Sequence, residues 1–272
     1  MLTVALVDDP NASRPLAVTL GLLVVSAAVA AAFWWHEAHT TEPMVRPRMF
    51  AVREVVAANL ASLLVGGGLI VALVGVPLFV NLVLVESPLD GGVTLMRLTA
   101  AVPLGAIAGG WLGSRLGLRL TASLGMLLAA AGFAGLQAWD ATLSEALRSV
   151  PQVVGGLGFG LVIAPLGAAV LQHVPEDSRA TASAWLTLSR VTGMLVGTAM
   201  LTSTGLGRFY ARASQADFRS PDFDRLVQEA QVTTFREVFI AAVVVMLLAA
   251  AVSWWIGRGE RDGSSESWWT LT

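Results

Sequence analysis

Seven apolar runs dominate this chain, and each is long enough to cross a lipid bilayer. A helix rises about 1.5 Å per residue, so about 20 residues span the roughly 30 Å hydrocarbon layer. Charged residues make up 13% of the chain and apolar residues 55%. The sequence therefore predicts an all-α, polytopic transmembrane helix bundle of about seven spans. The runs lie at approximately 15–35, 55–84, 93–113, 119–139, 150–172, 181–205 and 236–257.

The acidic residues avoid these runs. All 19 lie between or beyond the runs, or, in the case of Glu237, at the edge of the last one. A carboxylate in the hydrocarbon layer is costly, and one that is retained there usually serves a transport pathway. We therefore expect the interiors of the spans to lack acidic side chains, so that any coupling carboxylate comes from outside this sequence.

Composition also excludes several classes of function. A net charge of -2 with no basic run argues against nucleic acid as a partner. The chain has no cysteine, so disulfides and thiolate chemistry are excluded. Its three histidines, His36, His39 and His173, lie at the edges of the runs, and no carboxylate accompanies them inside a run. We expect no metal site, no cofactor and no enzyme activity.

The arginines of the short loops define a topology. Most of these arginines fall on one side of the membrane if the segment after the first run is cytoplasmic. The positive-inside rule then places the C-terminus in the cytoplasm and the N-terminus outside. The membrane we expect is the plasma (inner) membrane. Six tryptophans, expected at the membrane interfaces, mark ends of the runs: Trp34, Trp35, Trp111, Trp139, Trp254 and Trp255. The predicted parts are an extracytoplasmic segment 1–14, a transmembrane helix 15–35, a cytoplasmic loop 36–54, a six-helix domain 55–257 and a cytoplasmic tail 258–272.

An outer loop, 206–235, is predicted inside the six-helix domain. Ser220, Pro221 and Asp222 form a helix start, and Phe223, Leu226, Val227 and Ala230 follow at helical spacing. This pattern predicts a short amphipathic helix at the outer membrane surface. The alternative is a lid that handles substrate.

Small residues recur every four positions in three of the runs. Residues four apart share one face of a helix, and small side chains there let a neighbouring helix approach closely. The pattern predicts tight helix packing at Gly105, Gly109, Gly156, Gly160, Gly193 and Gly197.

The segment from Gly110 to Arg119 resembles the loop motif Gly-x-Leu-x-Asp-Arg-x-Gly-x-Arg of the major facilitator superfamily. Ser114 stands at the position of the motif's Asp. The resemblance implies a gating loop on the cytoplasmic side, formed by Gly110, Gly113, Arg115, Gly117 and Arg119. Further stretches are similar to the 14-helix drug:proton antiporter branch, with 208–210 closest to actinobacterial members: 58–60, 87–92, 156–165, 189–194 and 208–210.

This resemblance implies a function and a partner. By this resemblance the seven runs correspond to the C-terminal half of a 14-helix transporter, so an N-terminal half would be missing. The helix 15–35 would then be a linker-type helix, and 55–257 would be the C-terminal transporter domain. The implied activity is proton-coupled export of hydrophobic or amphiphilic small molecules, as in multidrug efflux, by alternating access within the lipid bilayer. Two alternatives are a lipid or glycolipid exporter half and a membrane remnant or assembly partner that does not transport.

Three polar residues are candidates for the substrate or proton pathway. Arg190 lies about 10 residues into its run, where an arginine costs roughly 2.5 to 3.5 kcal/mol on insertion scales. It either pairs with a carboxylate from outside this sequence or reaches back to the interface. Arg97 is near a helix end, where reaching the outer surface is easy. Asn59 opens the second run and binds either substrate or neighbouring backbone.

Overall fold

The computed structural model describes residues 51–85, 87–139, 144–213 and 223–257, together with scattered positions between 21 and 39. Within these residues the regular secondary structure is helical, which confirms the all-α polytopic class. Six of the described helices are long and apolar enough to cross a membrane: Arg53–Leu82, Pro88–Leu116, Leu118–Leu136, Glu145–Gln172, Glu176–Phe209 and Arg225–Ser253. The predicted segments 1–14 and 258–272 lie outside the described residues, as do most positions of the helix 15–35 and of the loop 36–54.

The described chain forms an ordered series of helices. In chain order the elements are α3 (Arg53–Ile70), a π-helical segment (Val71–Gly75), α4 (Val76–Leu82), α5 (Pro88–Leu116), α6 (Leu118–Leu136), α7 (Glu145–Gln172), a 3-10 turn (Glu176–Ser178), α8 (Arg179–Met200), a second π-helical segment (Leu201–Leu206), α9 (Gly207–Ala213) and α10 (Phe223–Ser253).

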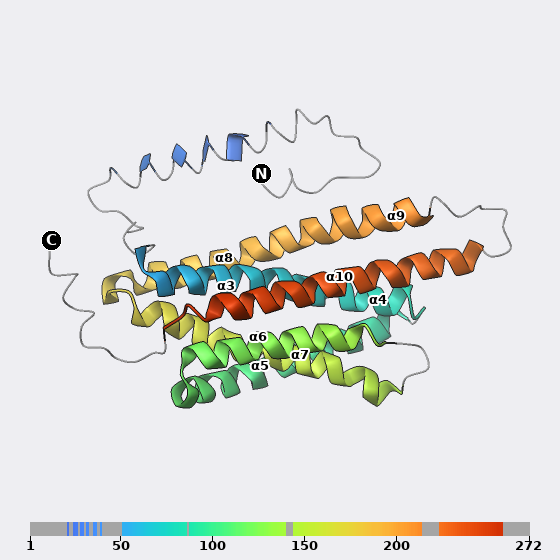
Figure 1. The fold of residues 1–272 in the computed structure, drawn as a ribbon, viewed down its shortest axis with the longest axis horizontal. Coiled ribbons are helices and arrows are strands. Elements are labelled where there is room, and N and C mark those ends of the chain that lie inside the picture. Colours follow the sequence, from blue (N-terminus) through green and yellow to red (C-terminus); the bar gives the residue numbers. More distant parts are fainter. Residues whose placement is uncertain are drawn as a thin grey trace.

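Successive spans run in alternating directions along the bundle (Figure 1). One end contains the turn between α5 and α6, the connection from α7 to α8 and the last turn of α10; we call it the Gly117 end. The opposite end contains the connection from α4 to α5 and the start of α7; we call it the Glu145 end. The predicted topology places the Gly117 end in the cytoplasm, and this orientation stays a prediction.

Local sequence signals set several helix ends. Ser87 and Asp90 form a capping box at the start of α5, in which the Ser87 hydroxyl and the Asp90 carboxylate each bond the backbone of the other residue. Gly117 separates α5 from α6 with a φ of 86°, a conformation that favours glycine. The second predicted span is interrupted by a π-helical segment just before Pro77, where the missing proline N–H disturbs the backbone ladder.

Close helix pairs and an aromatic cluster hold the bundle together. The pairs α5–α7, α6–α7 and α3–α8 form the most extensive interhelical packing. Phe79 of α4 meets Phe235 of α10 edge to face at a centroid distance of 5.4 Å. Phe239 of α10, only 1% exposed, lies 5.8 Å from the same Phe79 ring. The cluster ties α4 to the first half of α10.

The structure differs from two of the sequence-based expectations. The short amphipathic helix expected within 206–235 is continuous with the last span, because α10 runs unbroken from Phe223. Ala230 and Phe235 are 7% and 8% exposed, so the buried face of α10 extends well before residue 236. Trp139 is only 6% exposed and packs against Phe79 at 5.8 Å, so this indole is part of the core and not of an interfacial belt.

Candidate functional site

Asn59 lies in the seam between α3 and α8. Its side-chain oxygen accepts a hydrogen bond from the Ser189 hydroxyl at 2.8 Å, and its amide nitrogen donates to the Val55 carbonyl at 2.8 Å. One turn further on, the Ser62 hydroxyl donates to the Leu186 carbonyl at 3.0 Å. Both polar side chains are buried, so these bonds fix the register of α8 against α3. The Asn59 side chain therefore helps to hold α8 against α3.

Arg190 follows Ser189 in the same seam. The α8 backbone at Arg190 rests on Gly66 of α3, because a methyl group at Gly66 would overlap the Arg190 carbonyl oxygen. The Arg190 guanidinium is partly buried, and its buried Nε has no hydrogen-bond partner. None of the ion pairs among the described residues includes Arg190. Within the described part of the chain, this cation in the middle of a span therefore lacks a counter-charge.

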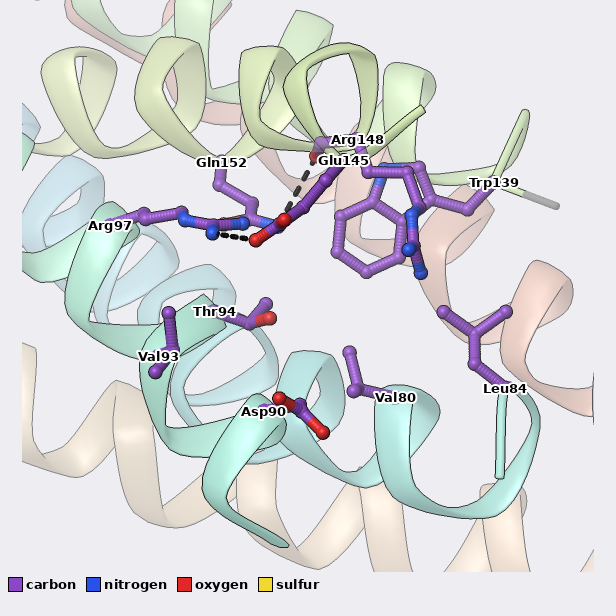
Figure 2. A pocket seen from close by; sticks show the side chains of 10 residues that line it. All are labelled: Val80, Leu84, Asp90, Val93, Thr94, Arg97, Trp139, Glu145, Arg148 and Gln152. Atoms are coloured by element: carbon purple, nitrogen blue, oxygen red, sulfur yellow. Dashed lines mark hydrogen bonds and ion pairs between the residues drawn. The ribbon is translucent and has the colours of Figure 1, made fainter. Parts of the chain in front are cut away.

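Arg97 and Asn59 lie in different parts of the bundle. Arg97 belongs to α5, and its guanidinium donates to the carboxylate of Glu145, the first residue of α7. Its side chain is 27% exposed. The Glu145 side chain is 70% exposed, so this ion pair bridges α5 and α7 at an exposed edge of the bundle; that this edge is the outer surface stays a prediction. The pair lines a cavity of about 260 Å³ (Figure 2).

The predicted gating loop forms the turn at the Gly117 end. Arg115 stacks on Trp111 at 4.2 Å, and Arg119 lies 3.5 Å above the ring of Trp254 near the end of α10. The Ser114 hydroxyl donates to the Trp111 carbonyl of its own helix at 2.8 Å. The contact of Arg119 with Trp254 thus joins the turn to the end of α10, and the motif's carboxylate has no equivalent at Ser114. A cavity of about 530 Å³ separates this turn from the last turns of α7.

The packing glycines lie at backbone-to-backbone contacts. A methyl group at Gly105 or Gly109 would meet the α7 backbone at Leu157 or Leu161. On α7, the equivalent group at Gly156 or Gly160 would meet the α5 backbone at Leu98 or Val102. Gly193 and Gly197 of α8 likewise face the α3 backbone at Leu63 and Gly67. These two seams leave no room for side chains at the six positions.

Glu237 forms an ionic cluster that the sequence analysis missed. It lies within the candidate span Arg225–Ser253, so the expectation of acid-free spans is wrong there. Its carboxylate accepts from Arg208 of α9 at 2.9 Å and from Arg212 at 2.5 Å. Arg212 also donates to the Thr234 hydroxyl at 3.1 Å. The four-residue spacing of Arg208 and Arg212 could have indicated this cluster, since residues four apart share a helix face and can bind one carboxylate.

An apolar groove runs between α3, α8 and α10. It has a volume of about 290 Å³, and its walls include Leu63, Val71 and Val245. Arg208 and Glu237 also line it. A groove with apolar walls and one ionic cluster suits an amphiphilic occupant better than a strongly charged one.

We predict that Glu237→Gln lowers the melting temperature by about 2–4 °C. This shift corresponds to a loss of about 1 kcal/mol in the free energy of unfolding, as expected for a partly exposed charge pair. The amide keeps the shape of the side chain but leaves both arginines of the cluster without their counter-charge. Thermal unfolding of the purified chain tests this, and the difference should shrink in high salt. Glu229→Gln is the matched control, because Glu229 is 62% exposed and lies 3.9 Å from Arg225. Equal shifts for both variants would contradict the prediction.

No group of three or more His, Cys, Asp or Glu side chains in the described residues is arranged to hold a metal ion. His173 directs its Nδ1 to the Ala169 carbonyl of its own helix at 2.7 Å. The polar groups that the structure brings together are thus arginines, carboxylates and amides on helix seams. Such groups can bind, orient or exchange ion-pair partners.

Comparison with known protein families shows to which family this helix bundle belongs. Residues 3–198 match the family model of the Major Facilitator Superfamily. The chain belongs to this superfamily. Membership explains the alternating spans and the motif-like turn at Gly117, and it accords with the expected absence of enzyme activity.

Several curated proteins similar to this chain are named triacylglyceride transporters. A triacylglyceride transporter of Mycolicibacterium smegmatis is 35% identical over 85% of this chain and 46% of its own length. One from Mycobacteroides abscessus is 36% identical over 74% of this chain and 41% of its own length. One from Mycobacterium tuberculosis is 33% identical over 90% of this chain and 52% of its own length. The chain spans about half the length of the curated relatives it matches.

A solved structure supports the fold. The crystal structure of a bacterial homologue of the human lysosomal transporter Spinster, in an inward-facing and unoccupied conformation, aligns with a TM-score of 0.57 at 19% identity. The alignment covers 79% of this chain and 50% of that one. The helices described here thus form a fold like half of a major facilitator transporter.

Proposed function

We propose that this chain is the C-terminal half of a lipid exporter whose cargo is of the triacylglyceride class. The observation that carries the proposal is the name shared by its relatives, which are triacylglyceride transporters at 33–36% identity. They favour the lipid alternative over the drug efflux that we expected first. The apolar groove between α3, α8 and α10 supports the same choice, because a neutral ester needs apolar walls and few charges.

In this proposal two helical halves rock about a central cavity, with this chain supplying one half. Arg190 is partly buried in the α3–α8 seam without a carboxylate among the described residues, so we propose that an acidic residue of the other half neutralises it. Asn59 and Ser189 hold the seam rigid, so that α3 and α8 move as a unit. The turn at Gly117 would face the cytoplasm and close that side of the cavity.

The test is export in cells. A strain of Mycolicibacterium smegmatis that lacks its own triacylglyceride transporter receives this chain alone, or together with the N-terminal half of that transporter. Mass spectrometry of the outer envelope then measures triacylglycerides. We expect export to be restored only when both halves are present. Membrane-inserted halves that restore no export would refute the proposal and favour an assembly partner that does not transport.

A further inference from the structure

A polar cavity at the Glu145 end is separate from the α3–α8 seam and from the groove beside it. It lies where α4, α5 and α7 meet, with a volume of about 260 Å³. In Figure 2, Arg97, Glu145 and Gln152 line one side of the open space, Thr94 and Asp90 lie across it, and Trp139 stands at its flank. This volume is many times the roughly 30 Å³ share of one water molecule, so a small solute fits.

Two deeply buried side chains of this cavity carry polar atoms without partners. Gln152 is 1% exposed; its amide nitrogen donates to the Arg148 carbonyl at 3.2 Å, but its Oε1 accepts from no described residue. Trp139 is 6% exposed, and its indole Nε1–H likewise has no acceptor in the described chain. Buried polar atoms are nearly always hydrogen-bonded, so each of these two is a position for a ligand atom.

Among the described residues that line the cavity, the charges balance. Two guanidiniums, of Arg97 and Arg148, face two carboxylates, of Asp90 and Glu145. Arg97 is paired with Glu145, and the Asp90 carboxylate accepts a hydrogen bond from the Ser87 hydroxyl at 2.6 Å. The described lining residues thus offer an ion no net opposite charge to offset the loss of its water shell. A neutral ligand meets no such penalty.

We propose that this cavity binds a neutral, hydroxyl-bearing molecule, such as a polyol or the glycosyl or glycerol head group of a lipid. A hydroxyl group can donate to the Oε1 of Gln152 and also accept from the Nε1–H of Trp139. The Thr94 hydroxyl offers a further contact. The indole of Trp139 and the side chain of Val80 cover the C–H surface of such a molecule, as amphipathic rings commonly do.

This inference goes beyond the proposed function and does not rest on it. Binding is measured on the full chain without transport, so a failure of lipid export leaves this site untouched. Failure of binding here would leave the export proposal equally intact.

The experiment is isothermal titration of the full chain in lipid nanodiscs prepared without sugar detergents. The probes are methyl β-D-glucopyranoside and glycerol, with sodium phosphate and choline chloride as anionic and cationic comparisons. Gln152→Leu removes the unpartnered oxygen at similar volume, and Thr94→Val removes a lining hydroxyl without changing shape. Gln137→Leu is the matched control, because Gln137 lies at the end of α6 and does not line the cavity.

We expect saturable binding of at least one hydroxylated probe to the wild-type chain and to Gln137→Leu. Gln152→Leu should weaken it at least about tenfold, because a buried hydrogen bond is lost, and Thr94→Val should weaken it less. Which probe saturates distinguishes a glycosyl source from a glycerol source. The proposal fails if neither probe binds, if phosphate or choline binds as well as the hydroxylated probes, or if both Gln152→Leu and Thr94→Val bind like the wild type.

Discussion

Replacing Gly109 with Ala should destabilise the bundle, although alanine is the better helix former. The new methyl group would lie 3.0 Å from the Leu161 Cα of α7 and closer still to the Leu161 carbonyl oxygen. Backbone atoms cannot swing aside as a side chain can, so α5 and α7 must separate. Overpacking of this kind costs about 1–3 kcal/mol, against a helix gain of about 1 kcal/mol. Gly109→Leu should abolish the folded protein. Thermal unfolding and the monodisperse fraction in gel filtration measure both effects.

The neighbouring residue provides the control. A methyl group at Gly110 would meet nothing within 4 Å, because Gly110 faces away from α7 on the same helix. Gly110→Ala should therefore leave stability unchanged or raise it by up to about 1 kcal/mol. Both variants replace a glycine of α5 with alanine one position apart, so the gain in helix propensity is the same and cancels from the difference in their stabilities. If both variants unfold at the same temperature, the close approach of α5 and α7 does not support the fold as described.

The apolar runs were sufficient to predict most of the fold. Each run from 55 onward corresponds to one membrane-length helix, because a bilayer imposes both length and composition on a span. The helix ends were harder to place. Residues 223–235 are polar enough to suggest a separate surface helix, yet they begin α10, since Ala230 and Phe235 continue its buried face. Polarity alone does not mark where a helix stops.

The sites were less predictable, because they join residues far apart in the sequence. Asn59 and Ser189 are 130 positions apart, and Arg97 and Glu145 are 48 positions apart. No spacing rule for a single helix relates such pairs. Asn59 and Arg190 were identified as unusual polar residues in apolar runs, and the structure places both in the α3–α8 seam. Gln152 gave no comparable signal, because its burial depends on three helices meeting around it.

The described charges near the ends of the spans differ from the one in mid-span. Glu237 and Glu145 each accept from an arginine on another helix or segment, and both pairs are satisfied within this chain. They fasten α9 to α10 and α5 to α7. Arg190 differs, since it lies in mid-span and no ion pair of the described chain includes it. Satisfied pairs hold one arrangement of helices, whereas an unmatched cation can change partners between two arrangements. Of these charges, Arg190 is therefore the one best suited to the rocking of two halves that we propose.

Arg190→Leu should reduce lipid export at least about tenfold while leaving the amount of protein in the membrane unchanged or higher. Export should fall because the ion pair proposed between the two halves is lost. Membrane insertion should not suffer, because the substitution removes a charge that costs roughly 2.5 to 3.5 kcal/mol in a span. The measurement is envelope triacylglyceride in cells that express both halves, normalised to membrane protein. Arg179→Leu is the matched control, because Arg179 starts the same helix and is 51% exposed.

Two further variants separate a transport role from a structural one. Arg190→Lys keeps the cation but loses the planar fork, so it should retain part of the export. Arg190→Glu should abolish export, and reversing the charge of the partner half's acidic residue should restore it, because the attraction between the halves then returns. A guanidinium that merely reaches the interface predicts the opposite pattern: Arg190→Leu would export normally, and no reversal in the other half would matter. Wild-type export by Arg190→Leu would therefore refute the ion pair, and rescue of Arg190→Glu by reversal would locate its acidic partner.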